Sequence, residues 1–233
     1  ENASAIGFLN KASGKNSVAV GSGYFEKSGV EEIEHYNLAS GENSAAIGLG
    51  NSATKKDSLA YGFKNEANSD GSLAFGNQNI SSGDNSSTFG FKNIASKTGS
   101  FALGTGNKAT NVKTVAVGSQ NKANGEFSAA IGNGYYNDIL GKAFFNQANG
   151  KHSSAIGVLN NATGDNNSAV GYRNKTGGNF SSAMGFKNEA IGDGSVAFGN
   201  ENKANSILNS AIGVGNITEE ENQRKSINSL NLV

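Results

Sequence analysis

Two short segments of this sequence concentrate side chains that could recognise a ligand. Residues 24–36 and residues 135–145 each open with two aromatic residues and close with another, directly before a regular pattern resumes. Tyrosine and phenylalanine often anchor interfaces, and loops on a rigid scaffold often carry binding residues. An alternative role for these aromatic side chains is to brace neighbouring chains of an assembly. We expect ligand contacts from Tyr24, Phe25, Tyr36, Tyr135, Tyr136, Ile139, Leu140 and Phe144.

Residues suited to catalysis or metal binding are few and scattered. The two histidines, His35 and His152, lie more than a hundred residues apart, and cysteine is absent. No His, Cys or carboxylate cluster has the spacing of a metal site, and no Gly-x-Ser-x-Gly nucleophile motif occurs. The acidic run at residues 31–34 fits a solvated surface better than a metal site. We therefore expect no enzymatic activity, no metal and no cofactor.

Both aromatic segments interrupt a repeat of fourteen residues, with the frame Ser/Thr-x-Ala/Thr-apolar-Gly-x-x-Asn-x-Ala/Ser. Residues 24–36 insert 13 residues into one copy, and residues 135–145 insert 11 into another. Self-similarity at a fixed period predicts a solenoid in which each copy forms one coil. The glycines that anchor the copies are Gly7, Gly21, Gly48, Gly62, Gly76, Gly90, Gly104, Gly118, Gly132, Gly157, Gly171, Gly185, Gly199 and Gly213.

The residues around each glycine predict two short strands per coil. With the glycine as position 0, position −1 is always large and apolar, position −2 is almost always alanine, and position −4 is mostly serine. This alternation is typical of a strand, and glycine then permits a turn. Asparagine at position +3 suits a turn and could stack into a ladder, so we expect its role to be structural.

The small residues should fill a thin interior, as with Ser44 and Ala46, while the bulky −1 residues point outward. The opposite arrangement, with bulky residues inside each coil, stays open. A row of exposed apolar side chains marks an interface, which a symmetric homo-oligomer would bury. The interface residues expected from this row include Ile47, Phe75, Phe89, Val117, Ile131, Ile156, Phe198 and Ile212.

Charge composition narrows the choice of partners. Among 233 residues, Lys plus Arg and Asp plus Glu both number 19, so the net charge is zero. A nucleic-acid-binding protein would carry a basic face, and none is indicated. No apolar run approaches the length of about 20 residues that a membrane-spanning helix needs.

The repeat frame resembles the head domain of trimeric autotransporter adhesins, the YadA-like family of Gram-negative bacteria. That resemblance implies an all-β, left-handed parallel β-roll whose three chains pack side by side as a homotrimer. It places the head at residues 1–222, with insertions at 24–36 and 135–145. Residues 223–233 resemble the beginning of the neck that leads into the stalk. We expect the chain to be part of a longer protein, with its membrane anchor elsewhere.

The resemblance also implies a function on the bacterial cell surface, beyond the outer membrane. The expected partners are host extracellular-matrix proteins (collagen, fibronectin or laminin) or a cell-surface receptor of the CEACAM kind. A phage fibre or spike that binds or degrades glycans is the alternative. It would need a carboxylate pair on adjacent coils, whereas Asp and Glu are scattered here.

Overall fold

The computed structural model describes residues 2–29 and 31–218, and in these ranges the chain is all-β. The chain forms two compact units, residues 1–113 and 114–233, which are described separately below. The predicted neck at residues 223–233 lies outside the described residues. No helix in the described ranges is long and apolar enough to cross a membrane.

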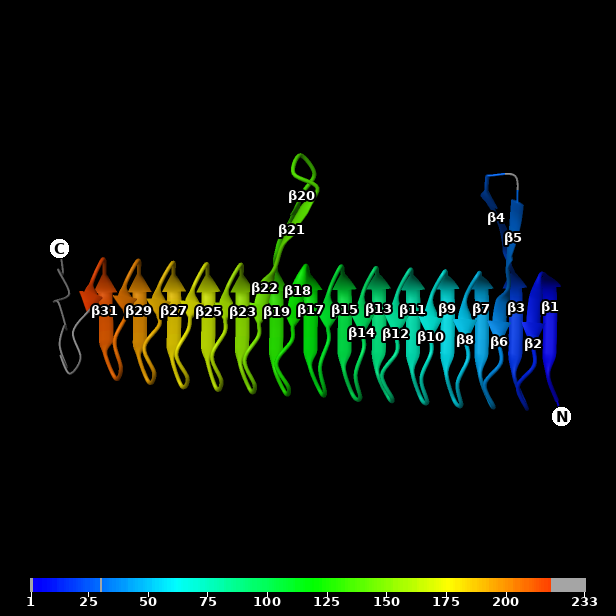
Figure 1. Cartoon of the computed structure of the whole chain (residues 1–233), viewed down its shortest axis with the longest axis horizontal. Helices are drawn as coiled ribbons and strands as arrows, with labels where there is room; N and C mark the ends of the chain where they lie inside the picture. Colours follow the sequence, from blue (N-terminus) through cyan, green and yellow to red (C-terminus); the bar gives the residue numbers. More distant parts are fainter. Residues whose placement is uncertain (1, 30, 219–233) are drawn as a thin grey trace. The chain divides into compact units, whose positions relative to one another are not determined.

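Each unit is a stack of coils, and every coil contains one long and one short strand (Figure 1). In the first unit the long strands are β1 (Ser4–Phe8), β3 (Val18–Ser22), β7 (Ala45–Leu49), β9 (Leu59–Phe63), β11 (Leu73–Asn77), β13 (Ser87–Phe91) and β15 (Phe101–Thr105). The short strands there are β2 (Asn10–Ala12), β6 (Asn37–Ala39), β8 (Ser52–Ala53), β10 (Glu66–Ala67), β12 (Ile80–Ser81), β14 (Ile94–Ala95) and β16 (Lys108–Ala109).

The second unit repeats this arrangement. Its long strands are β17 (Val115–Ser119), β19 (Ala129–Asn133), β23 (Ser154–Val158), β25 (Ser168–Tyr172), β27 (Ser182–Phe186), β29 (Val196–Asn200) and β31 (Ser210–Val214). Its short strands are β18 (Asn121–Ala123), β22 (Asn146–Ala148), β24 (Asn161–Ala162), β26 (Lys175–Thr176), β28 (Glu189–Ala190), β30 (Lys203–Ala204) and β32 (Ile217–Thr218).

Within each unit the long strands form one parallel sheet and the short strands form another. The register places equivalent positions of successive coils side by side, for example Gly48 beside Gly62 and Ile47 beside Tyr61. The predicted solenoid of fourteen-residue coils is therefore confirmed.

The interior of each coil is lined by small side chains, as the alternation predicted. Ser44 and Ala46 are 1% and 0% exposed, and Ala53, from the short strand, is also fully buried. Ile47 is half-buried, and Phe75 and Ile131 are 39% and 38% exposed. The arrangement with bulky residues inside the coil is excluded.

The anchoring glycine is required by close packing between coils as well as by the turn. Gly62 has a φ of +117°, and a Cβ atom there would lie 2.1 Å from the carbonyl oxygen of Gly76 in the next coil. Any side chain would push the coils apart, which explains why glycine occupies this position in every repeat.

The asparagines at position +3 form a buried ladder, which confirms their structural role. The Nδ2 atom of Asn79 donates to Asn65 Oδ1 at 3.0 Å, to Phe75 O at 3.0 Å and to Gly90 O at 2.7 Å. Its Oδ1 accepts from both Nδ2 and the backbone N–H of Asn93 in the next coil. Because buried polar groups need hydrogen-bond partners, each asparagine ties its own coil to both neighbours.

Candidate functional site

Two β-hairpins project from the coils at the same turn, between positions +2 and +3 (Figure 1). In a coil without an insertion, residue +2 makes this turn alone in a left-handed conformation, as Lys64 does with a φ of 50°. In the two interrupted coils position +2 is Gly23 or Gly134, and the hairpin follows directly. The predicted insertions are thus two copies of one structural device.

Glycine at the hairpin base is needed for space. A Cβ atom on Gly23 would lie 2.3 Å from His35 O, and one on Gly134 would lie 2.1 Å from Phe144 O. These close approaches explain the glycine-rich segment that precedes both insertions.

Hairpin 1 consists of β4 (Tyr24–Ser28) and β5 (Glu31–His35), which pair antiparallel. At its base, the Tyr24 ring stacks on His35 with a centroid distance of 4.5 Å. Tyr24 also lies against Gly50, where a Cβ atom would be 2.6 Å from the ring, and Lys64 Nζ is 3.9 Å from the ring centroid. Tyr24 therefore fixes the hairpin to the following coils.

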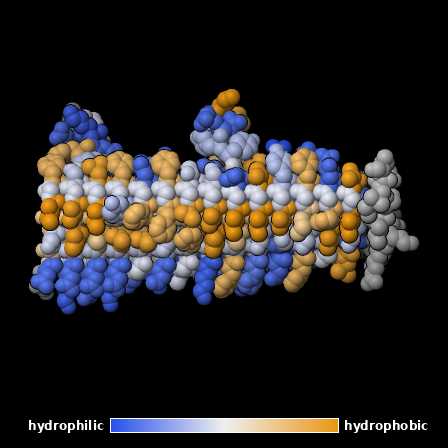
Figure 2. All heavy atoms as spheres, turned by 180° about the vertical axis from the view of Figure 1, so that it is seen from behind, coloured by the Kyte–Doolittle hydropathy of each residue, from blue (hydrophilic) through white to orange (hydrophobic). Residues whose placement is uncertain are grey.

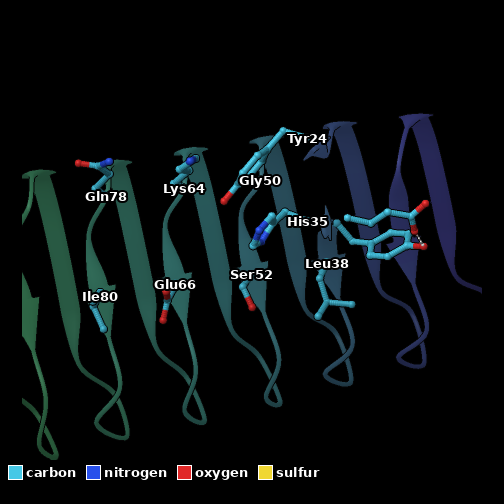
Figure 3. A pocket seen from close by; sticks show the side chains of 11 residues that line it. Tyr24, His35, Leu38, Gly50, Ser52, Lys64, Glu66, Gln78 and Ile80 are labelled. Atoms are coloured by element: carbon cyan, nitrogen blue, oxygen red, sulfur yellow. Dashed lines mark hydrogen bonds between the residues drawn. The ribbon is translucent and has the colours of Figure 1, made fainter. Parts of the chain in front are cut away.

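Groove 1 runs from the base of hairpin 1 along the next coils and has a volume of about 620 Å³. Figure 3 shows Lys64 and Gln78 along its turn edge and Ser52 and Glu66 on the short strands, with His35 near one end. The groove carries charges of both signs. Its lining residues are Tyr24, Glu34, His35, Tyr36, Leu38, Gly50, Ser52, Lys64, Glu66, Gln78 and Ile80.

One ionisable group in groove 1 is perturbed. The hydroxyl of Tyr36 donates a hydrogen bond to Glu34 Oε2, and this bond together with the negative charge of Glu34 raises the pKa of Tyr36. The phenol thus stays protonated and serves as a donor. His35 Nε2 lies 3.1 Å from Glu26 Oε2, an ion-pair distance without hydrogen-bond geometry.

Hairpin 2 consists of β20 (Tyr135–Asn137) and β21 (Lys142–Phe144), also antiparallel. Tyr135 stacks on Phe144 at 4.7 Å, in the same positions as the Tyr24–His35 stack of hairpin 1. Its tip is apolar, with Ile139 95% exposed and Leu140 64% exposed. Figure 2 shows this hydrophobic tip and, by contrast, the hydrophilic surface of hairpin 1.

Groove 2 lies beside hairpin 2, has a volume of about 480 Å³ and is built from the same coil positions as groove 1. Arg173 occupies the position of Lys64, and Asn161 that of Ser52. No carboxylate is among the described residues that line it. Those residues are Tyr135, Lys142, Ala143, Phe144, Phe145, Gln147, Leu159, Asn161 and Arg173.

The structure divides the expected ligand-contact residues between the grooves and the hairpin tips. Four of them line a groove and two lie at the tip of hairpin 2, while the remaining two are exposed on the hairpin strands. The groove-lining residues are Tyr24, Tyr36, Tyr135 and Phe144. The residues at the tip are Ile139 and Leu140, and the two exposed on the hairpin strands are Phe25 and Tyr136. Binding by any of them remains a prediction.

The groove residues Lys64, Gln147, Asn161 and Arg173 were missed at the sequence level. They belong to the regular repeat frame and not to the insertions, so nothing in their own sequence distinguishes them. The signal was the period itself, since positions +2 and +4 of successive coils must lie beside the base of each insertion.

A second candidate surface is the outward face of the long strands, here called the seam face, formed by positions −3, −1 and +1. In the first unit the Tyr61 and Phe75 rings stack at 4.4 Å, and Phe89 packs 6.1 Å from Phe75. In the second unit Ile131, Ile156, Phe198 and Ile212 are 38–49% exposed. Figure 2 shows the apolar rows along this face.

The described residues contain no group of three His, Cys, Asp or Glu side chains that could hold a metal ion.

The comparisons with known proteins agree with this architecture. The family model of the YadA head domain repeat matches residues 1–23, 39–65, 67–91, 95–120, 109–134, 148–174, 177–202 and 190–207, which together make up well over half of the chain. Both hairpins lie between matched segments. Among proteins of curated function, none matches the chain. The chain belongs to the YadA head repeat family, the head repeats of trimeric autotransporter adhesins.

Proposed function

We propose that this head attaches a bacterium to a host surface, as a homotrimer held together along the seam face. Family membership supports a surface-exposed adhesin head. The observation that supports attachment by this particular chain is the pair of hairpins, which present aromatic and apolar side chains on an otherwise regular scaffold. Residues 1–222 would form the head, and residues 223–233 would begin the neck that leads to an outer-membrane anchor.

The apolar seam face supports the trimer. Each fully buried apolar side chain contributes roughly 1.5–3 kcal/mol, and each unit carries a −1 residue in every coil. The side chains on this face are only half-buried in the single chain, so association would remove much of their remaining surface from water. Extended contiguous apolar patches of this kind are rare on soluble monomers.

The grooves would remain accessible in such a trimer. They are lined by position +4 of the short strands, for example Ser52 and Asn161, and by the turns at position +2. The −1 side chains belong to the other sheet and point to the opposite side of the coil. Packing along the seam face would therefore leave both grooves open, and three copies of each would add avidity.

The partner proposed is a matrix protein (collagen, fibronectin or laminin) or a CEACAM-like receptor. The test is to measure binding of the purified chain to an immobilised panel of these proteins. Variants lacking residues 24–36 or residues 135–145 should lose binding at least tenfold while remaining folded. Binding at full strength by both deletion variants would show that the adhesive surface lies on the repeats. Failure of the unchanged chain to bind any host surface would refute the proposal.

A further inference from the structure

Groove 2 is unusual in carrying positive charge without a compensating acid. Lys142 and Arg173 are its only charged lining residues in the described part of the chain. Neither has a carboxylate within ion-pair distance among those residues. Their contacts are with rings instead: Lys142 Nζ lies 5.7 Å from the Phe144 centroid, and Arg173 Cζ lies 5.2 Å from that of Tyr172.

Two amide side chains add further donors. Asn149 Nδ2 lies 3.4 Å from Gln147 Oε1 and 3.3 Å from Asn161 Oδ1, so each of these amide oxygens already accepts one hydrogen bond. Within the described residues, the NH₂ groups of Gln147 and Asn161 have no protein acceptor. The groove therefore offers hydrogen-bond donors from two cations and two amides, which suit a ligand rich in acceptor oxygens.

The third feature of groove 2 is its aromatic wall. The Tyr135 ring stacks on Phe144 but remains 41% exposed, and Leu159 extends the apolar surface along the next coil. A ligand with an apolar face as well as negative charge would be complementary to this lining. The volume of about 480 Å³ lies within the range of about 300–1,000 Å³ that is typical of ligand sites.

We propose that groove 2 binds an acidic saccharide, with a carboxylate or sulfate group held by Arg173 and Lys142. A pyranose ring offers both required features, because its C–H face packs on Tyr135 while its oxygens accept from Gln147 and Asn161. The proposal deepens the adhesive function proposed above by naming the ligand class of one site.

An acidic peptide fits less well. Extended peptides gain affinity by adding a strand to an open sheet edge. Strand β24 already pairs with β22 on one side and β26 on the other, and β22 pairs with β18 and β24. The floor of groove 2 therefore has no open strand edge, and the open edges in its hairpin wall, at β20 and β21, are only three residues long.

Groove 1 provides an internal comparison. It has the same scaffold positions, but Glu34 and Glu66 line it along with Lys64. These carboxylates would repel an anionic sugar, so acidic saccharide binding should map to hairpin 2 alone.

The test measures affinity of the full chain for defined tetrasaccharides by calorimetry at physiological salt. The probes are a heparin-derived tetrasaccharide, a hyaluronan tetrasaccharide that carries carboxylates only, and neutral chitotetraose. The key variant is Arg173→Gln, because Gln78 and Gln120 already occupy position +2 in other coils with the same left-handed backbone. Lys92→Gln is the matched control, since it removes one positive charge from the same coil position away from both hairpins.

At least one anionic tetrasaccharide should bind the unchanged chain, and Arg173→Gln should weaken its binding tenfold or more. Lys92→Gln should change affinity less than twofold, and chitotetraose should not bind. Binding of the heparin-derived tetrasaccharide alone would indicate recognition of sulfate. Binding of the hyaluronan tetrasaccharide would indicate recognition of carboxylate. Absence of binding by both anionic probes, or equal binding by Arg173→Gln, overturns the proposal.

Hexaglutamate is the competing ligand. If it binds groove 2 more tightly than either anionic tetrasaccharide, the partner is an acidic protein segment and the saccharide proposal is wrong. Because the tetrasaccharides and the panel of host proteins are separate ligands, saccharide binding and host-protein binding can fail independently.

Discussion

At the scale of single residues, the buried asparagines hold the coils together, a role that a large apolar core has in other folds. In the described residues the coil interior is built mainly from alanine, serine, threonine and asparagine, and the largest fully buried side chains are the +3 asparagines. Their amides bond to three successive coils, so each one fixes coil spacing as well as turn geometry.

Replacing Asn79 by alanine should therefore be strongly destabilising. The change leaves Phe75 O, Gly90 O and the amide of Asn93 without their partner. Since an unsatisfied buried polar group costs about 1–3 kcal/mol, we expect a loss of roughly 3 kcal/mol or more in the free energy of unfolding. Denaturant unfolding measures this loss. Lys203→Ala is the control, because Lys203 is exposed on short strand β30, away from the seam face, and should be nearly neutral.

At the scale of elements, the hairpins are additions to a coil that is complete without them. Gly23 and Asn37 occupy positions +2 and +3 of one interrupted coil, as Gly134 and Asn146 do in the other. Gly50 shows that glycine at +2 can make the turn directly, with a φ of 62°. Removing a whole insertion would restore the ordinary fourteen-residue coil.

Deletion of residues 24–36, or separately of residues 135–145, should leave the fold intact. Shortening a surface loop changes the closure entropy only slightly, so the free energy of unfolding should change by less than about 1 kcal/mol. Thermal and denaturant unfolding of each variant check this. Loss of cooperative unfolding would show that the hairpin base, with the Tyr24–His35 or Tyr135–Phe144 stack, is part of the folding unit.

The sequence allowed much of this to be predicted, because a repeat imposes the same environment on every copy. The alternation around Ala46 and Ile47 predicted which side chains are buried, and the +3 asparagines predicted the ladder. The antiparallel pairing inside the insertions carried no such signal, since neither segment is repeated within itself. The grooves were missed because Lys64 and Arg173 reach the hairpins through stacking of coils rather than through neighbouring sequence.

At the scale of the whole molecule, the surface proposed for assembly, the seam face, differs from the surfaces proposed for ligand binding, the grooves. Its apolar rows belong to the long strands, whereas the grooves are lined by the short strands and the adjoining turns. A trimer formed on one side of the coil therefore leaves the other side free for ligands. The proposed trimer and the proposed binding sites are compatible for this reason.

The trimer can be tested on this division of surfaces. Phe75→Asp combined with Phe89→Asp places two carboxylates per chain on adjacent coils of the seam face, where both side chains are now in ring contact. In a trimer packed along the seam face, three copies of each carboxylate would be buried close together without a partner charge. Because burying unpaired charge is costly, assembly should be lost. Ile80→Asp combined with Ile94→Asp is the matched control, with two half-buried apolar residues changed on adjacent short strands.

Native mass spectrometry should find three chains for the unchanged protein and the control, and no trimer for the seam variant. A soluble, folded monomer of the unchanged chain would contradict the assembly, and a trimer broken only by the control would place the interface on the short-strand face.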